Sequence, residues 1–141
     1  MKNITIDLGY QSICSINNSG WDQNDEFNRE RKLSESEVVI PATSIKIVID
    51  YPVEYKATYE HESKNGFTRK HLAELIAKDY QEMYDEEEAT TVIVPTNIPG
   101  MLNRCETNGK YGIWGHNIDD LILHTAKYDP KSGEVVCVCD S

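Results

Sequence analysis

Residues Ser44–Glu60, with the sequence Ser-Ile-Lys-Ile-Val-Ile-Asp-Tyr-Pro-Val-Glu-Tyr-Lys-Ala-Thr-Tyr-Glu, carry the clearest pattern in the chain. Every second position from Ile45 to Tyr59 is apolar or aromatic, and most positions between them are polar. Because side chains on a β-strand point alternately to its two faces, this period predicts one buried face and one solvated face. The segment is longer than a usual strand and contains Pro52, which has no N–H for the ladder. We therefore expect two strands that meet at a bend.

A long amphipathic helix is predicted from Thr68 to Asp85, with Thr68 as its N-cap. Arg69 and Lys70 lie in its first turn and acidic residues crowd its last, so its charges oppose the helix dipole. Packing against the sheet must therefore hold this helix, and we expect it to fray by Glu86. Its apolar residues recur at three- and four-residue spacing: Leu72, Leu75, Ile76 and Met83.

The remaining elements are shorter. Asn117 can cap a short helix. Gly133 can form the turn of a hairpin, and the second strand of this hairpin is apolar on both faces, as is typical of a strand inside a sheet. Two irregular stretches, 17–37 and 95–117, interrupt the pattern, and we expect Trp21 and Phe27 to pin the first of them. The other predicted strands are Ile4–Leu8, which Gly9 ends, Ile13–Ile16, Val38–Pro41, Thr90–Val94, Leu123–Tyr128 and Glu134–Asp140.

These elements predict a single α+β domain over residues 1–141. We expect a curved antiparallel sheet of about five strands with one long helix packed on one face. Only that one helix is available to cover the apolar face of the 44–60 segment. Part of its tyrosine row is therefore expected to remain for a ligand or a partner.

The charge of the chain restricts its partners. Its 141 residues include 27% charged side chains and have a net charge of −10. This charge argues against direct binding of nucleic acid and of anionic membranes, which need a basic face, and it suits a basic protein partner. Asp7 interrupts the place where a signal peptide needs its apolar run, so we expect a cytoplasmic protein whose four cysteines are reduced.

The most suggestive stretch for function is 108–120, which is rich in glycine and aromatic residues. Its glycines allow close approach of a ligand, its aromatic rings offer amphipathic surface, and its imidazole titrates near neutral pH. The alternative is a tight surface loop in which Trp114 is buried and the imidazole supports the start of the short helix. The candidate binding residues of this stretch are Tyr111, Trp114, His116, Asp119 and Asp120.

Tyr55 and Tyr59 complete the candidate binding set, because an exposed aromatic row is typical of a recognition surface. The alternative is that both belong to the core. Lys64, Arg69 and Lys70 form the one local basic patch, and His61 and His71 have the setting of ordinary surface residues.

The cysteines do not form a recognisable site. Cys137 and Cys139 suit buried apolar positions, since zinc would need two further ligands and no second close pair exists. Cys105 and His116 as nucleophile and base are separated by a glycine-rich loop that determines no geometry. We predict no metal site and no cofactor.

No motif settles the function, and three hypotheses remain. The first is a binding or regulatory protein that acts through protein–protein contacts, in its sharper form an inhibitor that imitates the charge of a nucleic acid. The second is a small hydrolase that uses His116 with Asp119 or Asp120. The third is a domain that binds a small ligand between the sheet and the 95–117 loop.

Overall fold

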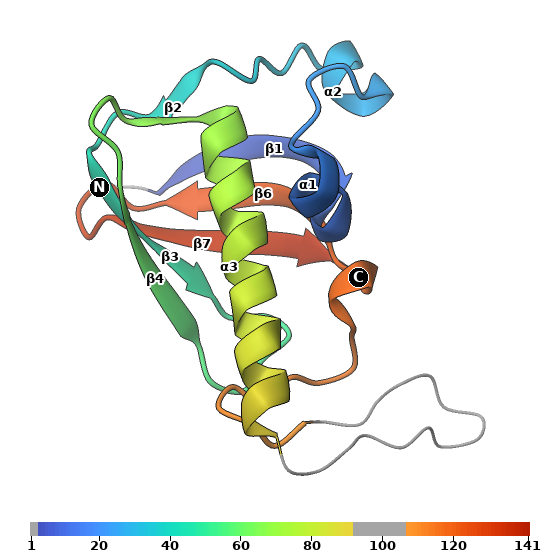
Figure 1. Ribbon diagram of the computed structural model, residues 1–141. Coiled ribbons are helices and arrows are strands. Elements are labelled where there is room, and N and C mark those ends of the chain that lie inside the picture. The colour runs from blue at the N-terminus through green and yellow to red at the C-terminus, as the bar shows by residue number, and fades with distance from the viewer. Residues whose placement is uncertain (1–2, 92–106) are drawn as a thin grey trace.

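A five-stranded sheet and one 22-residue helix form the two main layers of the structure (Figure 1). The computed structural model describes residues 3–91 and 107–141. The strands are β1 (Ile4–Ser12), β2 (Val38–Ile40), β3 (Ser44–Ile49), β4 (Ala57–Glu62), β5 (Phe67–Thr68), β6 (Ile122–Tyr128) and β7 (Glu134–Asp140). The helices are α1 (Ile13–Ser19), α2 (Glu26–Glu30), α3 (Arg69–Thr90) and the 3₁₀ helix η1 (Ile118–Asp120).

The large sheet has the order β1-β6-β7-β3-β4, and β2 and β5 pair separately. The predicted α+β class is confirmed, with one difference in the sheet. Three of its pairings are antiparallel, whereas β3 and β7 pair in parallel with Ile47 opposite Val135. The sheet is therefore mixed. Strand β7 lies inside it, as its apolar sequence predicts.

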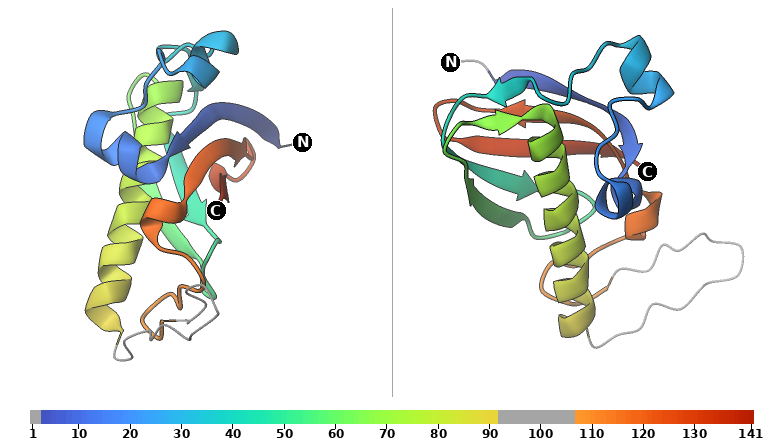
Figure 2. Two further views of the ribbon diagram at one scale, coloured as in Figure 1. Left: turned by 90° about the vertical axis from the view of Figure 1, so that its right-hand side faces the viewer. Right: turned by 45° about the horizontal axis from the view of Figure 1, so that its top comes forward.

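Helix α3 crosses one face of the sheet, and no other layer of the described residues covers the opposite face (Figure 2, left). Thr68 caps the helix, because its side-chain oxygen accepts a hydrogen bond from the backbone N–H of His71 at 3.1 Å. The side chains of Leu72, Ile76 and Met83 are fully buried. The predicted stripe therefore faces the core, while the uncovered face of the sheet is free for other contacts.

The alternating segment forms β3 and β4, which pair with each other across a bend, as predicted. Ile45, Ile47 and Ile49 point into the core, and the peptide bond between Tyr51 and Pro52 in the bend is cis. The tyrosines differ from one another. Tyr55 is 60% exposed, whereas Tyr59 is half-buried.

The prediction for the N-terminal region is partly wrong. Gly9 does not end β1, which continues to Ser12 through an irregular pairing with β6. Ile13–Ile16 is the start of α1 rather than a strand, because the Ser12 hydroxyl accepts the N–H of Ser15 and caps a helix there.

The stretch 17–37 is held mainly by Trp21 and Arg69. The buried Trp21 indole donates a 2.8 Å hydrogen bond to the Leu8 carbonyl. Phe27 on α2 is 37% exposed and packs on the Tyr10 ring of β1, with the ring centroids 5.8 Å apart. The Arg69 side chain is buried and donates to the carbonyls of Asp7 and Ser34, so it does not contribute to a basic surface patch.

Two predictions concern the region after α3. The helix continues to Thr90 and does not fray by Glu86, and Thr90 is its last residue rather than the start of a strand. Residues 92–94 of that predicted strand and residues 95–106 of the irregular stretch lie outside the described residues. The hairpin of β6 and β7 and the short helix after Asn117 are confirmed. In the described part of the chain, no helix has the length and apolar content to cross a membrane.

The backbone at Gly9 provides a test of the fold. Gly9 has φ +84°, and an added Cβ would lie 1.9 Å from the Asn28 side-chain oxygen. Gly133 has a similar φ of +78° but nothing within 4 Å of an added Cβ. We expect Gly133→Ala to lower the free energy of unfolding by about 1–2 kcal/mol through backbone strain alone. Gly9→Ala should cost about 2–5 kcal/mol because a steric clash is added.

Urea denaturation of the two variants checks this expectation. Equal losses for Gly9→Ala and Gly133→Ala would contradict the close contact between Gly9 and Asn28.

Candidate functional site

Two joined loops bring together most of the predicted binding residues. Residues 50–56 connect β3 to β4, and residues 107–117 run beside the last turns of α3 (orange and yellow in Figure 1). The N–H groups of Glu54 and Tyr55 donate to the Tyr111 carbonyl, at 3.1 and 3.0 Å. The N–H of Trp114 donates to the Pro52 carbonyl at 2.9 Å. These bonds fasten the loops to each other.

The carboxylate of Glu87 anchors the second loop to α3. Its oxygens accept hydrogen bonds from the backbone N–H groups of Gly109, Tyr111 and Gly112, at 2.8, 2.8 and 3.3 Å. The hydroxyl of Thr107 donates to the same carboxylate. Glu87 is only 2% exposed, so the loop is wrapped around a buried charge that it satisfies.

The pKa of Glu87 reflects this arrangement. Burial is the largest single effect and raises the pKa of this carboxyl group. The hydrogen bonds from Thr107 and from three backbone N–H groups lower the pKa, and their sum exceeds the effect of burial. The pKa of Glu87 therefore lies below its ordinary value, and the ionised form is the one that fits the loop.

The same loop also explains why α3 reaches Thr90. The N–H of Lys110 donates to the Thr90 hydroxyl at 2.9 Å, and the Lys110 ammonium lies 2.6 Å from the Glu86 carboxylate. The loop thus supplies a hydrogen-bond donor and a positive charge to the C-terminal end of α3. The acidic residues of this end do not stabilise the helix by themselves.

We define the aromatic surface as the ring cluster of Tyr51, Trp114 and His116 together with the exposed Tyr55, which lies on the same 50–56 loop as Tyr51. Trp114 is 41% exposed and meets Tyr51 edge to face, with the ring centroids 5.3 Å apart. The His116 ring lies 5.8 Å from that of Tyr51. Trp114 is therefore not buried, in contrast to the alternative in which this segment is only a tight loop.

No contact in the described residues joins His116 to Asp119 or Asp120. His116 Nε2 lies 3.2 Å from the Ser141 hydroxyl, which is 2.8 Å from the hydroxyl of Tyr51. Asp120 uses a carboxylate oxygen to accept the Asn117 N–H at 3.0 Å and so caps η1, while Asp119 is exposed. The geometry of an imidazole oriented by a carboxylate is therefore not found there.

The two remaining candidates lie beneath the surface. Tyr111 is 6% exposed and contributes mainly its backbone, and Tyr59 is half-buried on β4. Burial is the main cause that raises the pKa of Tyr59. Neither ring belongs to the aromatic surface.

An ion pair between β4 and α3 was missed by the sequence reasoning. His61 Nε2 lies 2.6 Å from a carboxylate oxygen of Asp79, which is 1% exposed. Burial raises the pKa of Asp79, and the imidazole opposes this effect. The prediction that His61 is an ordinary surface residue is wrong. Asp79 lies within the apolar stripe of the helix, and a buried carboxylate needs a hydrogen-bonding partner. This need could have indicated the interaction from the sequence.

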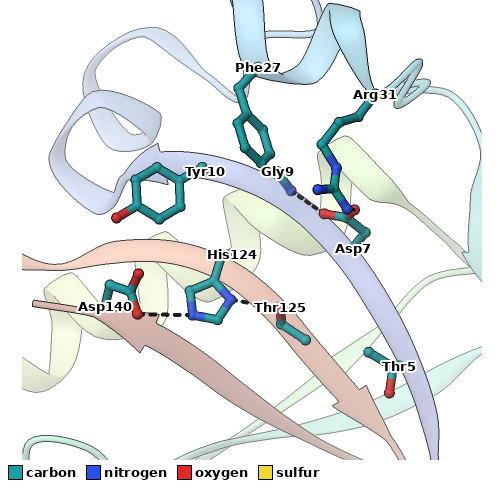
Figure 3. Close-up of a pocket in the computed structure, with 9 residues that line it drawn as sticks. All are labelled: Thr5, Asp7, Gly9, Tyr10, Phe27, Arg31, His124, Thr125 and Asp140. Carbon is teal, nitrogen blue, oxygen red and sulfur yellow. Dashed lines mark hydrogen bonds and ion pairs between the residues drawn. The ribbon is translucent and has the colours of Figure 1, made fainter.

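A second candidate site is a hollow on the uncovered face of the sheet, with a volume of about 400 Å³ (Figure 3). His124 Nε2 lies 3.3 Å from the Asp140 carboxylate, and its Nδ1 lies 2.7 Å from the Thr125 hydroxyl. The residues around the hollow are Thr5, Asp7, Gly9, Tyr10, Phe27, Arg31, His124, Thr125 and Asp140.

Sequence reasoning also missed this hollow. Its signal is a break in alternation in β6, where the buried residues Leu123 and Ala126 are three positions apart instead of two. Such a break indicates a bulge, and bulges re-aim side chains next to functional sites.

The cysteines behave as predicted for buried apolar residues. Cys137 is 3% exposed, and burial raises the pKa of its thiol. Burial likewise raises the pKa of Cys139 to about 12. Both thiols are therefore protonated and unreactive near neutral pH. Within residues 3–91 and 107–141, no three side chains of the metal-binding types gather as a ligand set.

Comparison of the chain with protein-family models, with curated proteins and with solved structures finds no match. The functional argument therefore rests on the geometry of the two candidate sites.

The anchor at Glu87 leads to a stability prediction. Glu87→Gln keeps the shape of the side chain but removes its charge and turns an NH₂ group toward N–H and O–H donors. We expect the free energy of unfolding to fall by about 2–3 kcal/mol at neutral pH, as for hydrogen bonds to a charged group. Urea denaturation measures the loss. The matched control Glu88→Gln, at an exposed neighbouring position, should change it by less than about 0.5 kcal/mol.

The same pair of proteins has a predictable pH dependence. The pKa of Glu87 is lowered in the folded state, so its stabilisation is complete above the ordinary value of 4.5 and is lost as pH falls through the folded value. The gap in stability between wild type and Glu87→Gln should therefore narrow in acid. A gap that stays constant into strong acid would show that the charge of Glu87 is not responsible.

Proposed function

We propose that this protein is a binding or regulatory module that acts through protein–protein contacts, with the aromatic surface as its contact site and a basic segment of the partner as its target. The observation that carries the proposal is the exposure of Trp114 and Tyr55 on loops that are fixed before any partner arrives.

Exposed tryptophan and tyrosine side chains favour this reading. These residue types are enriched among the few residues that supply most of the binding energy of protein interfaces. Hydrogen bonds to Glu87 and between the loops hold the backbone around Trp114 in place. Binding then costs little ordering entropy, which raises affinity.

The charge of the protein supports a basic partner. Glu54, on the 50–56 loop, is exposed. Asp119 and Asp120, which follow Trp114 in the chain, are exposed as well. Of the two lysines on the described parts of these loops, Lys110 is paired with Glu86 and Lys56 is exposed beside Tyr55. With a net charge of −10, the protein attracts basic partners over long range and repels acidic ones.

An inhibitor that imitates nucleic acid is the sharper form of this proposal. It requires that the partner itself binds DNA or RNA and that the nucleic acid competes for the same partner. The hydrolase hypothesis receives no support from the described contacts of His116. The proposed ligand pocket under the 95–117 loop falls largely on residues outside the described part.

Affinity capture from the native host tests the proposal. We expect the wild-type protein to recover a stoichiometric protein with a basic segment, and binding to weaken steeply as ionic strength rises. The double variant Trp114→Ala, Tyr55→Ala should lose at least about 2 kcal/mol of binding, or roughly thirtyfold in affinity.

Val38→Ser is the matched control, because Val38 is a 49%-exposed apolar residue on β2, away from these loops. It should bind the partner as the wild type does. Recovery of no stoichiometric partner, or equal recovery by the double variant, would refute the proposal.

A further inference from the structure

We propose that the hollow on the uncovered face of the sheet is a binding site for an organic cation with a guanidinium or ammonium head group. This site is separate from the aromatic surface and does not depend on the proposed protein partner. The hollow has a volume of about 400 Å³, which lies in the range of about 300–1,000 Å³ for small-molecule sites.

Two irregularities of the sheet meet at this place. Between β1 and β6, the register passes from Asp7 opposite Thr125 to Gln11 opposite Leu123, so three residues of β1 face His124 alone. Between β6 and β7, His124 is itself the extra residue. Bulges bend a strand and re-aim its side chains, and here they place Tyr10 and His124 at the hollow.

The walls of the hollow contain three aromatic rings in a row. The Tyr10 ring centroid lies 5.8 Å from that of Phe27 and 6.4 Å from that of His124, and Figure 3 shows Tyr10 between the two. Tyr10 is 43% exposed and Phe27 is 37% exposed. The face of an aromatic ring attracts a cation, and part of the Tyr10 ring remains open to solvent between its two neighbours.

The structure already holds one guanidinium in this manner. The Arg31 guanidinium carbon lies 5.1 Å from the centroid of Phe27, and the same group pairs with the carboxylate of Asp7. A ring face together with a carboxylate thus binds a guanidinium at one end of the hollow.

At the other end, a ring and a carboxylate again lie together, and the neighbour of the carboxylate is the His124 imidazole instead of a guanidinium. The Asp140 side chain is 55% exposed and lies beside Tyr10 and His124. Tyr10 and Asp140 both line the hollow, and interaction with the Asp140 carboxylate is the main cause that raises the pKa of Tyr10. With Arg31 engaged by Asp7, the hollow favours a cation over an anion.

An NMR titration of the ¹⁵N-labelled protein tests the proposal. The probe is L-arginine amide, and the matched control ligand is citrulline amide, in which a neutral urea replaces the guanidinium. We expect saturable shift changes at the amides of Tyr10, His124 and Thr125, and binding of the control at least about tenfold weaker, as the loss of charge and cation–π attraction implies.

Variants localise the effect. Asp140→Asn and Tyr10→Leu should each weaken binding at least about fivefold, within the range for one cation–π or ion-pair contact. Glu134→Gln, which removes an exposed carboxylate from the same strand β7, should leave it unchanged. An unaltered spectrum away from the hollow shows that each variant is folded.

A capped Gly-Arg-Gly peptide distinguishes the two sources of the head group. Tighter binding of the peptide than of agmatine assigns the site to a protein side chain, and the reverse assigns it to a small metabolite. The proposal is overturned if citrulline amide binds equally, if inorganic phosphate binds in place of the cation, or if Glu134→Gln loses as much affinity as Asp140→Asn. Shift changes that never saturate or that spread over the acidic end of α3 would also overturn it.

Discussion

The carboxylate of Glu87 is the constraint on which the aromatic surface depends. It is buried near the end of α3 and accepts hydrogen bonds from three backbone N–H groups and one hydroxyl of the 107–113 segment. A buried charge is stable only when such partners surround it, so the helix and the loop stabilise each other. The loop then fixes the 50–56 connection through backbone bonds, and Trp114 and Tyr55 are presented as a result.

The two faces of the sheet differ in how they are covered. Helix α3 covers one face with the apolar stripe of Leu72, Ile76 and Met83. No helix of the described residues crosses the opposite face (Figure 2), although α2 borders it at the β1 edge, where the bulges around His124 interrupt regular pairing. Both candidate sites lie on irregular backbone: the joined loops carry the aromatic surface, and the bulges around His124 carry the hollow. The regular strands hold these segments in position.

Sequence periodicity predicted the elements whose pattern is local. The alternation of Ile45, Ile47 and Ile49 indicated β3, and Thr68 marked the start of α3. Periodicity could not predict what depends on distant groups. The parallel pairing of β3 with β7, the length of α3 beyond Asp85 and the ion pair of Asp79 with His61 all depend on residues far away in the chain. Of the predicted binding residues, Tyr55, Tyr111, Trp114 and His116 lie on the joined loops. The hollow at His124 had only a broken alternation to indicate it.

The central claim is that Glu87 holds the aromatic loop in one conformation in the free protein. Hydrogen exchange of the backbone amides of Tyr111 and Gly112, followed by NMR, measures this most directly. The account predicts that both amides exchange slowly, at rates close to those of buried amides in β7, since each donates to a buried carboxylate. Exchange of these two amides at the rate of an unstructured loop would contradict it.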